Sequence, residues 1–271
     1  MKIEITEGII PKAERVVIYG PEGIGKSTFA SKFPDPLFID TEGSTNELNV
    51  RRLPKPLTWN HIVEEINYVI NEPDCCKTLV IDTVDWCEKI CAEYIIAKAD
   101  AQTPGKKISS IEDFGYGKGY TRLAEEFKGF LDALLAVSEL GIHVVLTAHA
   151  QMRKFERPDE SGAYDRWELK LEKKDCPLVK EWATMVLFAN YDIIAVKDSN
   201  GRTKAHGGQR VMYTTHHPCW DAKNRKGMPE KLPFGYESIA EYIRQDLSVS
   251  DEAALNLPID YAKTDDDIMF I

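Results

Sequence analysis

The sequence contains no run of about 18 uncharged apolar residues, which a membrane-spanning helix requires. Its N-terminal stretch carries Lys2, Glu4 and Glu7, which is not the pattern of a secretory signal. The six cysteines form no CxxC pair, so neither a disulfide framework nor a zinc ribbon is predicted. We therefore expect a cytoplasmic protein with no membrane partner.

Positive charge is also scarce, because 44 acidic residues face 34 basic ones and the net charge is -10. Taken over the whole chain, this balance argues against a nucleic-acid binder. The acids are concentrated from residue 246 onward, whereas residues 201–231 carry a basic excess. Such a basic stripe can bind a polyanion even in an acidic protein, although a solvated surface is the alternative.

Short apolar runs rich in β-branched residues alternate with helical patterns through the first half of the chain. The predicted strands are residues 15–19, 37–40, 78–82 and 142–147, and the predicted helices are residues 26–33, 58–71, 84–99 and 120–140. Repeated βα units of this kind favour an α/β fold with a mostly parallel β-sheet flanked by helices on both faces.

The pattern changes after Ala148. A polar stretch over residues 151–175 precedes a predicted helix over 178–188 and two predicted strands, 192–197 and 209–214. The Ser199-Asn200-Gly201 turn between these strands predicts a β-hairpin at the sheet edge. A last amphipathic helix is predicted over 237–246, so we expect one domain over residues 1–246 and an acidic, disordered tail over 247–271.

The strongest motif is GPEGIGKS, which fits GxxxxGK[ST], follows an apolar strand and opens a helix. Its glycines let backbone N–H groups point at a β-phosphate, and the helix N-terminus adds partial positive charge. Lys26 is expected to reach the β- and γ-phosphates and Ser27 to bind magnesium, so ATP and Mg²⁺ are the expected cofactors. A glycine-rich turn without a ligand is the alternative. The expected nucleotide-binding residues are Gly20, Pro21, Glu22, Gly23, Ile24, Gly25, Lys26, Ser27 and Thr28.

Carboxylates at strand ends supply the remaining chemistry of hydrolysis. Asp82 ends an apolar strand and is the candidate that holds magnesium through water, at the Walker B position. Asp85 is the second choice, although its place early in the next helix suits a helix cap. A group that orients the attacking water is also needed, and the residues alone leave Glu22, Asp40, Glu42 and Asp85 open.

A sensor of the γ-phosphate is expected at the end of the strand that contains VVLTAH. His149 is the first candidate and Thr147 the second, because each places a polar side chain where the strand ends. A packed or solvated histidine is the alternative.

Six stretches together resemble the ATPase core of RecA-like recombinases, and more closely the phage-encoded AAA-type ATP-binding proteins of that lineage. The resemblance covers residues 12–246, and some members of the phage group act in single-strand annealing or recombination. The stretches are GPEGIGKS at 20–27, FIDTEG at 38–43, LVIDT at 79–83, FGYGKGY at 114–120, VVLTAH at 144–149 and WDAKNR at 220–225.

The resemblance implies a RecA-like P-loop NTPase core that hydrolyses ATP to ADP and phosphate and is stimulated by DNA. The catalytic glutamate of that family follows the strand after the P-loop helix, where Glu42 lies, and its sensor matches His149. That sensor is usually glutamine, so histidine departs from the family pattern. The implied catalytic residues are Lys26, Glu42 and His149.

The resemblance also places two DNA-binding loops, here at residues 100–118 and 151–175. Lysine and arginine would pair with the phosphates of single-stranded DNA, and aromatic side chains would stack on its bases. The second stretch also contains seven acids, which lowers its net charge. The candidate DNA-binding residues are Lys106, Lys107, Lys118, Arg153, Lys154 and Arg157.

RecA-like subunits usually complete their active site with a basic residue of a neighbour, which acts like an arginine finger. The candidates are Arg202, Lys204, Lys223 and Arg225. The resemblance therefore implies a homo-oligomer, either a ring or a filament. Only a short segment precedes the first predicted strand, so we expect the oligomer to be built from surfaces of the core.

The C-terminal residues 265–271 are acids followed by apolar residues, DDDIMFI. They resemble the acidic tip of bacterial single-stranded DNA-binding proteins, which implies competition with DNA or docking on host or phage repair proteins. A merely solubilising tail is the alternative.

The expected function is Mg-ATP-dependent control of single-stranded DNA binding and annealing in phage recombination, in the host cytoplasm. The rivals are a motor ATPase of phage replication or packaging, a nucleotide-gated adaptor and a small-molecule kinase.

Overall fold

The computed structural model describes residue 5 and residues 7–103, 105, 107–156, 162–197 and 203–244. Its nine-stranded sheet has the order β3-β2-β4-β5-β1-β7-β8-β9, with β6 paired to β5. The neighbours from β3 to β7 pair in parallel, and the other pairings are antiparallel. The strands are β1 Arg15–Gly20, β2 Pro36–Asp40, β3 Arg51–Arg52, β4 Thr78–Asp82, β5 His143–Glu156, β6 Ala163–Leu169, β7 Met185–Lys197, β8 Thr203–Tyr213 and β9 Lys231–Pro233.

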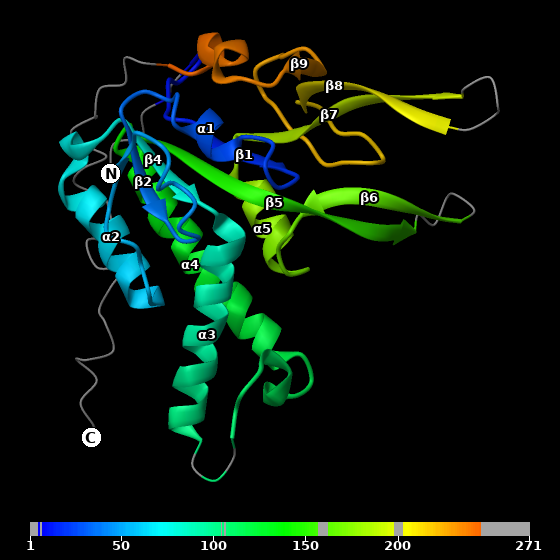
Figure 1. Cartoon of the computed structure of the whole chain (residues 1–271). Helices are drawn as coiled ribbons and strands as arrows, with labels where there is room; N and C mark the ends of the chain where they lie inside the picture. The colour runs from blue at the N-terminus through cyan, green and yellow to red at the C-terminus, as the bar shows by residue number, and fades with distance from the viewer. Residues whose placement is uncertain are drawn as a thin grey trace.

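Helices cover both faces of the parallel part of the sheet (Figure 1). One face packs against α2, α3, α4 and α5, and the other packs against α1 and the C-terminal turns. The α/β fold with a mostly parallel sheet is confirmed. The helices are α1 Lys26–Ala30, α2 Trp59–Asn71, α3 Val84–Gln102, α4 Lys118–Glu139 and α5 Asp175–Trp182, with 3-10 turns η1 Pro73–Cys75, η2 Ile111–Phe114, η3 Tyr236–Ser238 and η4 Ala240–Tyr242.

The central strands are buried on both faces, which explains their continuous apolar runs. In β1, Val17 and Tyr19 belong to the core beneath the long helices, whereas Val16 and Ile18 belong to the core beneath α1. All four of these side chains are fully buried. A slip in register would move each of them to the opposite core, so the pairing of neighbouring strands is strongly specified.

Two long hairpins extend beyond the carboxyl ends of the parallel strands and project on the same side of the molecule (Figure 1). One is formed by β5 and β6, and the other by β7 and β8. The expected C-terminal hairpin is therefore confirmed, although its predicted turn lies outside the described residues. The prediction of a polar loop over residues 151–175 is wrong, because most of that stretch belongs to β5, β6 and α5.

Two predicted helices also differ from the structure. The one over 178–188 ends at Trp182, because Met185–Phe188 instead pair in parallel with β1 and fill the core beside it. In place of a helix from 237, the chain forms the short turns η3 and η4, which bury Ile239 and Ile243. The tail over 247–271 lies outside the described residues. Within the described part of the chain, no helix is long and apolar enough to cross a membrane.

Glu65 is an acid in the core side of α2. Its side chain is buried, and its oxygens accept no hydrogen bond within the described part of the chain, although His61 Nε2 lies 3.5 Å from Oε1. Burial, aided by the charge of Glu64, raises the pKa of Glu65 to about 8. The folded protein therefore holds a proton on Glu65 at neutral pH.

We predict that Glu65→Gln stabilises the protein mainly at alkaline pH. An unfolded glutamate titrates near 4.5, so the native state retains the extra proton between pH 4.5 and about 8. The free energy of unfolding consequently falls as pH rises through this interval. Because the amide does not titrate, the substitution should raise that free energy by about 2–4 kcal/mol at pH 8.5 and by little at pH 5. Urea titrations measure this, with Glu93→Gln, at an exposed glutamate of α3, as the control, and an equal effect at both pH values would contradict it.

Candidate active site

The sequence-predicted active-site residues meet where the parallel strands end. The pairing of β1 with β5 places Gly20 beside His149, and the pairing of β4 with β5 places Asp82 beside Thr147. Since β5 lies between β1 and β4, its last core residues separate the P-loop from Asp82. A cavity of about 360 Å³ opens at this edge. It is lined by Glu22, Gly23, Gly25, Lys26, Ser27, Thr28, Glu42, Ser44, Glu47, Leu48, Thr83 and His149.

The P-loop connects β1 to α1 through two backbone constraints. A Cβ atom on Gly20 would lie 2.4 Å from the carbonyl oxygen of Ala189, so the close approach of β7 requires glycine there. Gly25 has a φ of 105°, in the left-handed region, and α1 begins at the next residue. These two glycines of the motif therefore allow the backbone to turn from β1 into α1, as the sequence predicts.

Lys26 is buried at the start of α1. Its Nζ donates to the carbonyl oxygens of Gly20, at 3.1 Å, and Pro21, at 3.0 Å. Burial lowers the pKa of Lys26, whereas the surrounding acids, Asp85 and Asp82 foremost, oppose that shift. An anionic phosphate beside Nζ would also favour the ammonium form.

Asp82 is fully buried at the end of β4, and hydroxyl groups hold its carboxylate. The Ser44 hydroxyl donates to Oδ2 at 3.2 Å, and the Thr147 hydroxyl donates to Oδ1. Together with Ser27, these groups form an all-oxygen set, the donor chemistry that Mg²⁺ prefers. The described residues contain no group of three or more His, Cys, Asp or Glu side chains that could hold a metal ion. The set therefore suits an ion that keeps its waters and binds phosphate oxygens.

Asp40 fixes the loop that carries Glu42. Its carboxylate accepts hydrogen bonds from the backbone N–H groups of Gly43, at 2.6 Å, Ser44, at 3.2 Å, and Thr45, at 3.0 Å, and from the Thr45 hydroxyl at 2.6 Å. Although burial opposes ionisation, these bonds lower the pKa of Asp40. The four bonds occupy this carboxylate in the loop, whereas Glu42 lines the cavity.

His149 lies between two acids at the end of the parallel part of β5. Its Nδ1 is 2.8 Å from Asp85 Oδ2, and its Nε2 is 4.0 Å from Glu42 Oε2. The backbone N–H of His149 also donates to Asp85 Oδ1, at 3.0 Å. Asp85 therefore orients both the ring and the backbone of His149, a role that the sequence analysis missed. No local signal reveals it, since the contact depends on how α3 packs beside β5.

The three groups shift each other's protonation. The hydrogen bond that the His149 ring donates to the Asp85 carboxylate raises the pKa of His149. Burial raises the pKa of Glu42, and the neighbouring His149 charge partly offsets this shift. Although burial opposes it, the bonds from His149 lower the pKa of Asp85. The arrangement therefore favours a cationic imidazole that faces a carboxylate with weakened acidity.

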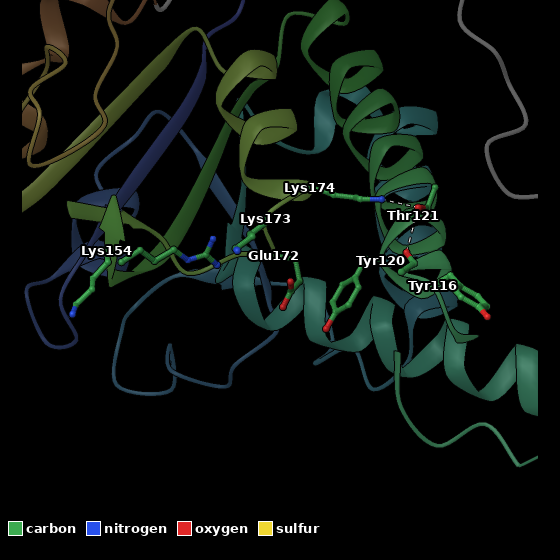
Figure 2. A pocket seen from close by; sticks show the side chains of 9 residues that line it. Tyr116, Tyr120, Thr121, Lys154, Glu172, Lys173 and Lys174 are labelled. Atoms are coloured by element: carbon green, nitrogen blue, oxygen red, sulfur yellow. Dashed lines mark hydrogen bonds between the residues drawn. The ribbon is translucent and has the colours of Figure 1, made fainter. Parts of the chain in front are cut away.

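The two stretches predicted to bind DNA meet in a second hollow, of about 740 Å³. Figure 2 shows Tyr116 and Tyr120 near the start of α4, Lys154 from the β5–β6 hairpin, and Lys173 and Lys174 from the segment before α5. Gly117, Thr121, Arg153 and Glu172 complete the lining. Its four cations therefore face a single acid.

The predicted DNA-binding cations are placed unevenly. Arg153 and Lys154 line the hollow, and Lys118 begins α4 beside Gly117. The Arg153 guanidinium also donates to the Leu171 carbonyl oxygen, at 2.7 Å. Lys107 does not line the hollow. Lys106 and Arg157 lie outside the described residues.

Of the four candidates for a residue that acts on a neighbouring subunit, the structure describes the side chains of Lys223 and Arg225. Lys223 Nζ donates to the carbonyl oxygens of Lys180, Glu181 and Ala183, at 2.8, 3.3 and 2.6 Å, and so holds the end of α5. Arg225 is exposed and lines a hollow at the amino ends of the strands, together with Arg15. Lys204 lies in β8, and Arg202 lies outside the described residues.

Comparison with known proteins agrees with this geometry. A family model described as an AAA domain matches residues 12–226, a span that contains every group lining the nucleotide cavity. No curated protein matches the chain. Because the match covers most of the chain and the P-loop is formed in the expected place, the protein belongs to the AAA domain family of P-loop ATPase-like proteins.

Proposed function

We propose that this protein is a RecA-like Mg-ATPase that controls the binding of single-stranded DNA in phage recombination or annealing. The observation that carries the proposal is the path of β5. Its inner part brings His149 to the nucleotide cavity and Thr147 to Asp82, and its outer part brings Arg153 and Lys154 to the hollow of Figure 2. A single strand thereby connects the two sites.

Nucleotide binding falls to the P-loop. The backbone N–H groups from Gly23 to Ser27 enclose the phosphates, and the Lys26 ammonium pairs with their outer oxygens. The Ser27 hydroxyl, and Asp82 through water, would hold Mg²⁺, which neutralises phosphate charge when bound. Ser44 and Thr147 keep the Asp82 carboxylate oriented through their hydroxyl groups.

Hydrolysis falls to Glu42, which orients water for attack on the γ-phosphate and accepts its proton. The pKa of Glu42, raised by burial, improves its strength as a base. His149 senses the γ-phosphate through Nε2, the ring nitrogen that Asp85 does not contact and that lies 4.0 Å from Glu42 Oε2. A change at His149 is passed to the segment that follows β6 and carries Lys173 and Lys174, because the Lys170 N–H donates to the His149 carbonyl oxygen at 2.9 Å.

Single-stranded DNA is the ligand that best suits the hollow of Figure 2. Lys154, Lys173 and Lys174 offer cations to a phosphate backbone, and the fully exposed Tyr116 lies at the end of the same hollow opposite Lys154. Cations combined with exposed aromatic side chains hold single strands without sequence preference.

We further propose a ring or filament in which Arg202, Lys204 or Arg225 of one subunit approaches the nucleotide of the next. Repair proteins that bind the tail over 247–271 remain part of this proposal.

We predict that Lys26 and Glu42 separate binding from hydrolysis. Lys26→Ala should abolish ADP and ATP binding, because the loop loses its phosphate-pairing cation. Glu42→Gln should bind nucleotide within about threefold of wild type and lose at least 10²-fold in turnover, as expected for a missing general base. Equilibrium dialysis and phosphate release measure the two effects. Glu47→Gln, which changes another glutamate of the same cavity, is the control, and normal turnover of Glu42→Gln would show that the base is wrongly assigned.

We predict that Asp85→Asn lowers both the pKa of His149 and the rate of ATP turnover. Removal of the charge should move the pKa of His149 down, toward its ordinary value, because the Asp85 hydrogen bond is what raises it. Loss of a charged hydrogen bond should reduce turnover by roughly tenfold with little change in nucleotide affinity. An NMR titration of the imidazole follows the pKa, and unchanged titration of His149 would contradict its pairing with Asp85.

We predict that Tyr116→Ala weakens binding of single-stranded DNA. Loss of one stacked base costs about 1–3 kcal/mol, so affinity for labelled oligo-dT should fall roughly 5- to 150-fold. Lys154→Ala should reduce the salt dependence by about 0.7 in log–log slope, the value for one phosphate contact of a single strand. Fluorescence anisotropy measures both effects. Tyr68→Ala, which removes an exposed tyrosine from α2, is the matched control, and equal affinities of Tyr116→Ala and Tyr68→Ala would rule out the stacking role.

A further inference from the structure

We infer that Arg210 is a positioning residue that aims a P-loop N–H group at the nucleotide. Arg210 belongs to β8, far from the P-loop in the sequence, yet its Nη1 donates to the carbonyl oxygen of Ile24 at 3.0 Å. Ile24 occupies the position before the last glycine of the motif. The inference rests on nucleotide binding at this loop and adds a residue that the motif does not contain.

The geometry of the peptide bond gives the contact its consequence. The Ile24–Gly25 peptide is planar, so its C=O and N–H groups point in opposite directions. Ile24 is fully buried and does not line the nucleotide cavity, whereas Gly25 does. A bond that holds the carbonyl oxygen on the Arg210 side therefore turns the Gly25 N–H toward the phosphates. No backbone carbonyl of the described residues accepts that N–H, so the donor is available to a ligand.

Arg210 is itself held in place by aromatic side chains. Its guanidinium lies 5.8 Å from the ring centre of Phe234, and Phe234 stacks on Phe29 of α1 at 5.4 Å. A Cβ atom on Gly25 would lie 2.9 Å from Arg210 Nη1 and 3.6 Å from the Phe234 ring. Gly25 is therefore required by its neighbours as well as by its φ angle. Arg210 and Phe234 form a platform beneath the end of the P-loop and the start of α1.

Within the part of the chain that the structure describes, no other polar group competes with Ile24 for the Arg210 guanidinium. Among those residues the guanidinium of Arg210 has no carboxylate partner, and its one hydrogen bond is the one to the Ile24 carbonyl oxygen. The bond also connects the β7–β8 hairpin to the P-loop, since Arg210 lies in the inner half of β8, opposite Tyr191. The P-loop is thus supported from the edge of the sheet as well as from β1.

The test compares Arg210→Ala and Arg210→Lys with wild type in the full chain. Arg210→Ala should bind Mg-ADP about tenfold more weakly, since a charged hydrogen bond is lost, and Arg210→Lys should recover part of that loss. The N–H contact exists in both the ground state and the transition state, so KM should rise while kcat stays within about twofold. Arg122→Ala is the matched control, because Arg122 also lies over a phenylalanine ring, 5.4 Å from Phe114, but does not contact the P-loop.

A spectroscopic signal separates positioning from loss of structure. With ¹⁵N-glycine labelling, Mg-ADP should move the amide resonance of Gly25 in wild type and much less in Arg210→Ala, while the amide of Gly23 moves in both. Unchanged affinity of Arg210→Ala would overturn the inference. Weaker affinity with the Gly25 shift retained would also overturn it, and would indicate direct contact between Arg210 and the nucleotide. A wild-type protein that binds no Mg-ADP would instead refute nucleotide binding itself.

Discussion

The parallel pairing of β5 between β1 and β4 fixes where the groups of the nucleotide site lie. Side chains on both faces of these strands are fully buried, so a slip of one residue would exchange two different cores. The fixed register aligns Gly20 with His149 and Thr147 with Asp82. Groups that are far apart in the sequence consequently meet at one edge, with no requirement for a rigid loop to bring them there.

The same alignment buries carboxylates, and hydrogen bonds to their oxygens offset the cost of this burial. Asp82 and Asp85 are buried, and a buried carboxylate without partners is costly. Hydroxyl groups hold Asp82, whereas the ring and backbone of His149 hold Asp85. Glu42 has fewer partners and keeps a raised pKa, which is the state expected of a general base. Oriented acids thus lie behind Ser44 and His149, which line the same cavity as Glu42.

Local patterns predicted the P-loop and the central strands because those features depend on neighbouring residues. The apolar run of β1 and the glycine at position 25 can each be recognised from a few neighbouring residues of the sequence. The β5–β6 hairpin was missed because charges at Arg153 and Lys154 hide the alternation that pairs Met152 with Trp167 and Phe155 with Tyr164. Contacts of Asp85 with His149 and of Arg210 with Ile24 join distant segments, so only the packed structure reveals them.

The most direct test of the account is ATP turnover by the full chain with and without single-stranded DNA, at low and moderate salt. Phosphate release is measured against Lys26→Ala as the blank. We expect turnover above the blank, stimulation by oligo-dT, and weaker stimulation as salt rises. Turnover that is the same with and without oligo-dT at every salt concentration would contradict a role in controlling the binding of single-stranded DNA. Turnover no greater than the blank would contradict ATP hydrolysis itself.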